Sequence, residues 1–136
     1  MRKKLNLRQK NFLVYGLGLT GISVVKYLKK LNVQNLYVWD DIKKNKKLSK
    51  KNKIIKFNKI INIVDYIVVS PGIDFEKSIF KNQMKLNFSK IITDIDLFYL
   101  TQSNFKSIVV TGTNGKSTTC KIIEHLLLKN KFNVKI

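Results

Sequence analysis

Residues 11–21 read Asn-Phe-Leu-Val-Tyr-Gly-Leu-Gly-Leu-Thr-Gly, an apolar run that ends in a glycine-rich turn. The run Asn11–Tyr15 predicts a short buried strand, and the apolar residues that recur at helical spacing over 22–31 predict a helix. A second apolar run predicts a strand at 36–39. The stretch therefore predicts a β-α-β unit whose first turn carries the pattern Gly-x-Gly-x-x-Gly.

The second predicted strand ends in Asp40, which stands about 20 residues beyond Gly21, as in the dinucleotide-binding fingerprint. In that fingerprint the amides at the start of the helix bind a diphosphate, and the acid binds a ribose hydroxyl. The sequence therefore predicts a nucleotide site at this turn. A nicotinamide-dependent oxidoreductase is one interpretation that this pattern leaves open.

The rest of the chain continues the alternation of strands and helices. Tyr66–Ser70 predicts a strand that stops at Pro71-Gly72, where an open α/β sheet binds its ligands. The remaining expectations are a loop or short helix over 43–53, strands at 54–57 and 90–93, and helices at 75–86 and 94–100, the last with Asp94 as its N-cap. This order predicts an α/β fold with a Rossmann-like, mostly parallel sheet.

A second glycine turn follows the apolar run Ile108–Val110, which predicts a strand, and precedes a predicted helix over 118–129. Gly112 and Gly115 let the backbone curl closely around phosphate oxygens, and the amides of 113–116 can point inward as an anion site. Strand, glycine turn, Lys-Ser and helix form the layout of a phosphate-binding loop. The usual first glycine is replaced by Val110, so this loop is a compact variant.

Composition limits the classes of function. The 136 residues carry a net charge of +19, but only two of the 27 basic residues are arginines. Lysine occurs here together with many asparagines and isoleucines, and aromatic stacking platforms and docking motifs for nucleic acid are not evident, so specific nucleic-acid binding is not expected. No apolar run approaches the roughly 20 residues of a membrane span. A cytoplasmic protein is expected.

Four motifs occur in an order that resembles the Mur ligase family: Gly16–Gly21, Ser70–Ile73, Asp94–Phe98 and Gly112–Thr118. The resemblance implies a Rossmann-like domain over 1–104 that binds a UDP-linked substrate. It also implies that 105–136 begin the central ATP-binding domain, with its first strand, phosphate loop and helix. On this interpretation the chain is truncated, and it is expected to be inactive alone.

The Ser-Pro-Gly-Ile turn and the Lys-Ser-Thr ending favour the branch of the family that adds D-glutamate to UDP-N-acetylmuramoyl-L-alanine in peptidoglycan synthesis, acting as a monomer. The resemblance implies ATP and Mg²⁺ as cofactors and Lys116 as the catalytic residue. The ATP-binding residues that it implies are Gly112, Thr113, Asn114, Gly115, Lys116, Ser117 and Thr118, with Ser117 and Thr118 as Mg²⁺ ligands. The residues implied for the UDP-linked substrate are Leu19, Thr20, Asp40 and Gly72.

The chain departs from the family after Asp40, where D-glutamate-adding members often carry a threonine and an arginine. Asp41 and Ile42 stand there, and two adjacent carboxylates are unfavourable beside a nucleotide, so uridine contacts are not carried over to these two residues. Cys120 and His125 are expected to be packing or surface residues. A self-contained nucleotide-binding module, an oxidoreductase fragment and another Mur-type ligase remain open alternatives.

Overall fold

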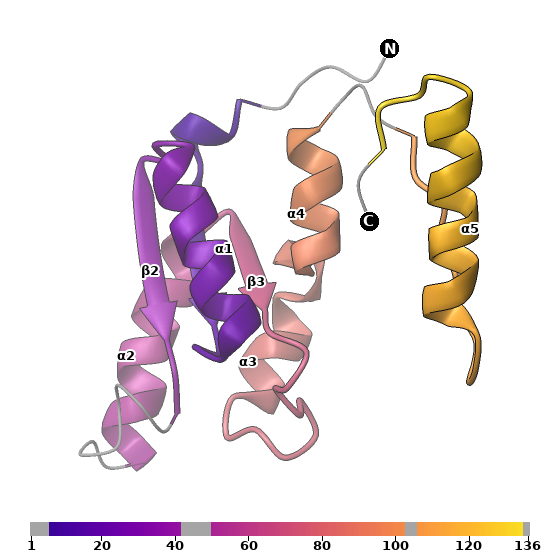
Figure 1. Ribbon diagram of the computed structural model, residues 1–136. Coiled ribbons are helices and arrows are strands. Elements are labelled where there is room, and N and C mark those ends of the chain that lie inside the picture. Colours follow the sequence, from indigo (N-terminus) through magenta and orange to yellow (C-terminus); the bar gives the residue numbers. More distant parts are fainter. Residues whose placement is uncertain (1–5, 42–49, 103–105, 135–136) are drawn as a thin grey trace. The chain divides into compact units, whose positions relative to one another are not determined.

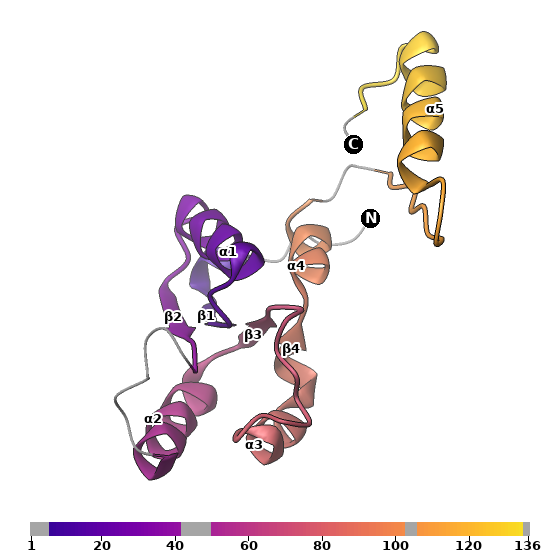
Figure 2. The same cartoon turned by 60° about the horizontal axis from the view of Figure 1, so that its bottom comes forward.

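A computed structural model describes residues 6–41, 50–102 and 106–134; Figure 1 labels its α-helices and two of its strands, and Figure 2 labels all four strands. The chain divides into two compact units, Met1–Ser103 and Asn104–Ile136. In the described part of the chain, no helix has both the length and the apolar character that crossing a membrane requires.

The first unit is built on a four-stranded sheet in the order β2-β1-β3-β4, and all neighbouring strands are parallel. The strands are β1 (Asn11–Tyr15), β2 (Asn35–Trp39), β3 (Tyr66–Val69) and β4 (Ile91–Ile92). The chain leaves β1 toward β2 on one side and later returns to place β3 on the other side. The predicted α/β fold with a parallel sheet is confirmed.

Helices cover both faces of this sheet. Figure 2 shows α1 (Leu19–Lys30) and α4 (Asp94–Thr101) on one face, with α2 (Lys50–Ile63) and α3 (Lys81–Leu86) on the other. Single 3-10 turns precede β1 and β4, at Leu7–Gln9 and Phe88–Lys90. Because both faces are covered, the central strands β1 and β3 bury consecutive side chains rather than alternate ones.

Two apolar clusters fill the spaces between the sheet and its helices. Phe12 and Val14 of β1 pack with α1 and α4, whereas Leu13 and Tyr15 pack with α2 and the segment around α3, because successive side chains of a strand point to opposite faces. All four side chains have no exposed surface. Strand β1 is therefore the centre of the unit, and the loop that follows it begins from a fully buried strand.

The strand expected at 54–57 is wrong, because these residues lie within α2. The buried residues of this segment are Phe57, Ile61 and Val64, which lie three and four positions apart. That spacing places them on one side of a helix. A four-residue apolar run cannot distinguish a strand from a buried helical turn, and the wider spacing decides the structure here.

Smaller differences concern the ends of elements. The helix expected at 75–86 begins only at Lys81, and β4 is two residues long. The N-cap of α4 is Thr93 rather than Asp94, because Thr93 Oγ1 accepts a hydrogen bond from Asp96 N while the Asp96 carboxylate accepts one from Thr93 N. The Asp96 carboxylate accepts hydrogen bonds from both the amide and the hydroxyl of Thr93, and these two bonds lower the pKa of Asp96.

The second unit contains α5 (Lys116–Lys129), which begins at the predicted phosphate loop. The strand expected at Ile108–Val110 is wrong for this chain, since the residues form no strand and Val109 is 82% exposed. A strand needs a neighbour to pair its backbone groups, and the described residues of this unit provide none. The loop or short helix expected over 43–53 lies outside the described residues as far as 49, and its last part belongs to α2.

Asp65 joins the beginnings of β1 and β3 and gives a testable pH dependence. Its carboxylate accepts from the Asn11 amide at 2.8 Å and from Lys10 Nζ at 2.9 Å. The backbone bond first, and Lys10 second, lower the pKa of Asp65. A carboxyl group whose folded pKa is lowered stabilises the fold above its unfolded pKa, near 3.9, and loses this effect as the pH falls through the folded value.

Asp65→Asn is therefore expected to lower the free energy of unfolding by about 1 kcal/mol at pH 7, and the difference from wild type should shrink as the pH falls through the lowered pKa of Asp65. Urea unfolding followed by the fluorescence of Trp39, the single tryptophan, measures this. Lys10→Met is the matched variant, and it should retain most of the pH dependence because the Asn11 bond is the larger cause. A wild-type-to-Asn difference that is constant from pH 2 to 7 would contradict the assignment.

Candidate functional site

The glycine-rich loop 16–18 joins β1 to α1 at the carboxyl edge of the sheet. It lies beside the end of β3, because β1 is paired with β2 on one side and with β3 on the other. The carboxyl ends of strands at such a switch in strand order are where open α/β sheets bind ligands. The fold therefore places the predicted loop at the expected edge.

Gly16 begins the loop with a left-handed backbone, φ +93°, that side-chain-bearing residues rarely adopt. A Cβ atom at this position would lie 2.9 Å from the Cβ of Ser70. The Ser70 hydroxyl donates to the Gly16 carbonyl oxygen at 2.8 Å. The first turn of the loop is thus closed against the end of β3.

Gly21 lies in the first turn of α1, directly over the loop. A Cβ atom at Gly21 would lie 1.8 Å from the Gly16 carbonyl oxygen, which is far too close for two non-bonded atoms. Gly18, by contrast, has open space around the position of a Cβ atom. The third glycine of the pattern therefore serves helix packing, and the second leaves the backbone open to a ligand.

Asp40 holds the loop from the neighbouring strand. Its Oδ2 atom accepts a hydrogen bond from the Leu17 amide at 2.8 Å, and the residue is only 8% exposed. The carboxylate thus fixes the middle of the loop and adds negative charge at the end of β2. Residue Leu17 was not among the predicted site residues, and neither was Ser70. The position of Ser70 directly before Pro71-Gly72, at a strand end, was the signal that points to it.

The predicted ligand residues of this unit lie around the same loop. Leu19 and Thr20 form the first turn of α1, and the Leu19 side chain is 90% exposed. The N-cap residue is Gly18, and within the described residues no side chain caps this helix end, so its first amides remain available to an anion. Gly72 is exposed and lies between Ser70 and Ile73, which both approach Gly16.

The second predicted loop, 112–115, leads into α5 in the other unit. Gly112 and Gly115 both have positive φ, of 146° and 75°, and Gly115 is the N-cap of the helix. Lys116 turns back over the loop, where its Nζ atom donates to the carbonyl oxygens of Gly112 and Thr113. The geometry gathers one ammonium group and the first amides of a helix at one loop, which is the chemistry that phosphate binding requires.

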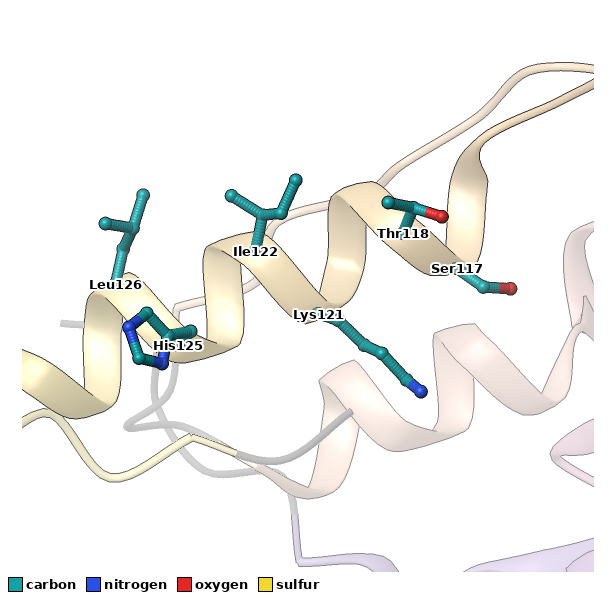
Figure 3. A pocket seen from close by; sticks show the side chains of 6 residues that line it. All are labelled: Ser117, Thr118, Lys121, Ile122, His125 and Leu126. Carbon is teal, nitrogen blue, oxygen red and sulfur yellow. The ribbon is translucent and has the colours of Figure 1, made fainter.

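Ser117 and Thr118 follow in the first turn of α5, with exposed side chains (Figure 3). A hydroxyl oxygen is a hard ligand suited to Mg²⁺, which usually keeps several waters and shares phosphate oxygens. Within the described part of the chain, no cluster of three or more His, Cys, Asp or Glu residues could hold a metal ion. The exposed hydroxyl groups of Ser117 and Thr118 fit a Mg²⁺ ion that is shared with phosphate oxygens.

Helix α5 also carries Lys121, His125 and Cys120. Figure 3 shows Ile122 and Leu126 projecting to the same side of the helix, with Lys121 pointing away from them. His125 is exposed and Cys120 is a half-buried free thiol. Both therefore occupy packing or surface positions.

The first unit thus has the defining features of a class, the parallel α/β domains with a glycine-rich loop between the first strand and first helix. A family model described as "Mur ligase MurD-like, N-terminal domain" matches residues 10–92. The chain belongs to this family.

Curated relatives agree with the family assignment. The chain is 39% identical over 125 residues to the UDP-N-acetylmuramoylalanine--D-glutamate ligase of Rickettsia prowazekii, covering 86% of this chain and 27% of that protein. Identity is 39% over 128 residues to the same-named ligase of Rickettsia bellii, covering 90% and 28% of the two chains. For the ligase of Oenococcus oeni the identity is 33% over 133 residues, covering 98% and 29%. The chain therefore spans less than a third of the length of these relatives.

Proposed function

We propose that this chain supplies the substrate-binding domain and the ATP loop of an ATP-dependent ligase that joins D-glutamate to UDP-N-acetylmuramoyl-L-alanine. The observation that carries the proposal is the loop at the switch in strand order, with Gly16 closed against Ser70 and the Leu17 amide held by Asp40. The names of the curated relatives support it, and so does the second glycine loop beside Lys116. The proposed setting is the cytoplasm, where the nucleotide substrates occur.

The first unit is proposed to bind the UDP-linked substrate, in a domain that extends over 1–104. The amides at the start of α1, in Leu19 and Thr20, face the diphosphate, because the positive end of the helix dipole favours an anion there. Asp40, at the end of the neighbouring strand, lies toward the uridine end. Gly72 adds a stretch of exposed backbone without a side chain, against which the ligand can lie closely.

The second unit, proposed to begin at 105, supplies the ATP loop. The proposed ATP-binding residues are Gly112, Thr113, Asn114, Gly115, Lys116, Ser117 and Thr118. The Lys116 ammonium neutralises charge on the phosphoryl group that moves from ATP to the alanine carboxylate, before the D-glutamate amine displaces phosphate. Mg²⁺, held through the hydroxyls of Ser117 and Thr118, would add further charge stabilisation. In such a transfer the protein mainly positions and stabilises charge, so no covalent nucleophile is required.

Calorimetric titration of residues 1–136 separates this proposal from an oxidoreductase. UDP-N-acetylmuramoyl-L-alanine is expected to bind at least tenfold more tightly than NAD, because the site is assigned to a uridine diphosphate. UDP alone should bind with intermediate affinity, since it carries the diphosphate without the sugar and alanine. Tighter binding of NAD than of the uridine ligand would overturn the proposal. Binding of both nucleotides with equal affinity would indicate a general nucleotide-binding module.

A further inference from the structure

Asp41, the second of the two adjacent acids, is joined to the aromatic core of the first unit. Its Oδ2 atom accepts from the Tyr15 hydroxyl at 2.8 Å, and its Oδ1 atom accepts from Trp39 Nε1 at 2.9 Å. Tyr15 has no exposed surface and Trp39 has 1%. Two buried aromatic side chains, Tyr15 at the end of β1 and Trp39 at the end of β2, thus both donate to one carboxylate.

The core around these polar atoms is aromatic and tightly packed. The ring centroids of Trp39 and Phe57 lie 5.3 Å apart, and those of Phe57 and Phe80 lie 4.1 Å apart. A buried polar atom in such surroundings is costly unless it has a hydrogen-bond partner. Asp41 therefore satisfies two donors that the packing places beside each other, and burial raises the pKa of the Tyr15 phenol, which stays protonated as a donor.

The hydrogen bonds continue from Tyr15 to the segment after β3. Ser78 Oγ lies 2.9 Å from the Tyr15 hydroxyl oxygen and accepts from the Phe80 amide at 3.0 Å. Since Tyr15 has one proton and gives it to Asp41, the Ser78 hydroxyl donates to Tyr15. A chain of three hydrogen bonds thus runs from Phe80 through Ser78 and Tyr15 to Asp41, and such chains strengthen their members.

This series of hydrogen bonds connects the three segments around the candidate site. Tyr15 directly precedes Gly16, and its carbonyl oxygen accepts from the Ser70 amide at 2.9 Å. Asp41 directly follows Asp40, whose carboxylate holds the loop through Leu17. We propose that Asp41 is a positioning residue of the uridine site, an inference that rests on the proposed function. Asp41 acts through Tyr15 and Trp39 and does not contact the ligand.

The proposal gives the second acid a role that removes an electrostatic difficulty. Two neighbouring carboxylates that both faced a nucleotide would repel its phosphates. Here both oxygen atoms of Asp41 accept hydrogen bonds from the protein. The buried side chains of Tyr15 and Trp39 therefore fix the orientation of the Asp41 carboxylate. The pair of acids is therefore divided between two tasks, Asp40 on the loop and Asp41 on the aromatic core.

The test is a double-mutant cycle of Asp41→Asn and Tyr15→Phe, with affinity for UDP-N-acetylmuramoyl-L-alanine measured by calorimetry on residues 1–136. Each single variant is expected to bind about tenfold more weakly, the size of one hydrogen bond to a charged group. The double variant should lose little more than either single one, because both break the same connection. Glu124→Gln, in the other unit, removes one negative charge and should bind like wild type.

Tryptophan fluorescence provides a second readout on the same samples. Trp39 is the single tryptophan, so loss of its hydrogen bond in Asp41→Asn should change the emission of the folded protein before ligand is added. Tyr15→Phe should leave the bond to Trp39, and hence this emission, nearly unchanged. An Asp41→Asn emission spectrum identical to wild type would contradict the contact on which the proposal depends.

Three affinity results have distinct meanings. If Asp41→Asn loses affinity while Tyr15→Phe binds like wild type, the bond from Tyr15 to Asp41 contributes nothing to affinity, and the positioning role as proposed is wrong. If wild type binds and neither substitution alters affinity, the positioning role is wrong while the proposed function stands. If wild type itself fails to bind the uridine ligand, the proposed function fails, and the positioning role fails with it.

Discussion

Gly21→Ala is expected to lower the free energy of unfolding of the first unit by about 3 kcal/mol or more, at the upper end of overpacking costs. The new Cβ atom would lie 1.8 Å from the Gly16 carbonyl oxygen, and this neighbour is backbone held by Ser70. The helix must therefore move away from the loop, which separates the amides of α1 from Gly16. Urea unfolding followed by Trp39 fluorescence measures the loss of stability.

Gly18→Ala is the matched control for Gly21→Ala. The backbone at Gly18 has φ −70° and open space around the Cβ position, so stability should change by about 1 kcal/mol at most, the usual cost of alanine at an N-cap. Binding of the uridine ligand should nevertheless weaken about tenfold, because the methyl group stands where the loop is open to a diphosphate. Equal losses of stability in the two variants would show that the loop packs differently.

Lys116→Ala is expected to lower D-glutamate-dependent phosphate release by about 10³-fold in a protein that carries this loop and performs the ligase reaction. The Lys116 ammonium group lies over the loop, where it donates to the carbonyl oxygens of Gly112 and Thr113. It is proposed to neutralise the negative charge of the phosphoryl group during its transfer. Affinity for UDP-N-acetylmuramoyl-L-alanine should stay within about twofold of wild type, because the residues proposed to bind uridine are in the other unit.

Lys121→Ala is the matched control for Lys116→Ala, since it removes the same charge from the exposed surface of the same helix. Turnover of this variant should resemble that of wild type. Comparable losses in both variants would assign the effect to general positive charge on α5. A fall in uridine affinity as large as the fall in turnover would show that the two sites are not divided between the units.

The parts of the fold that sequence predicts well are those in which local pattern and tertiary packing agree. Strand β1 is a continuous apolar run followed by a glycine turn, and a strand buried on both faces has that composition. The glycine turn and Asp40 together indicate strand order around the loop, because a β-α-β unit places both at one edge. The parallel α/β fold follows from these two features.

The segment 54–57 could not be assigned from its own residues. An apolar run of four residues is compatible with a strand or with a buried helix, and only contacts far away in sequence decide. Phe57 packs on Trp39 and Phe80, which come from β2 and from the turn before α3. The apolar run at 108–110 fails for a related reason, because a strand exists only where another strand accepts its backbone hydrogen bonds.

The roles of individual polar residues were only partly accessible from sequence. Spacing predicts Asp40 as a site residue, but it does not predict that the Asp40 carboxylate accepts a hydrogen bond from the Leu17 amide. Asp41 was seen only as a departure from the family, since nothing in the order of residues brings it to Tyr15, 26 positions earlier. Hydrogen bonds of this kind depend on the register between parallel strands, which fixes Tyr15 beside Trp39.

The most direct test of the account is a residue-resolved NMR titration of residues 1–136 with UDP-N-acetylmuramoyl-L-alanine. The largest saturable shifts are expected at the amides of Leu17, Gly18, Leu19 and Thr20, with further shifts at Asp40 and Gly72, because these surround the loop at the end of β1. Residues of α5 should not shift with this ligand alone. Saturable shifts confined to lysine-rich surface positions, with the loop amides unmoved, would contradict the claim that this loop holds a uridine diphosphate.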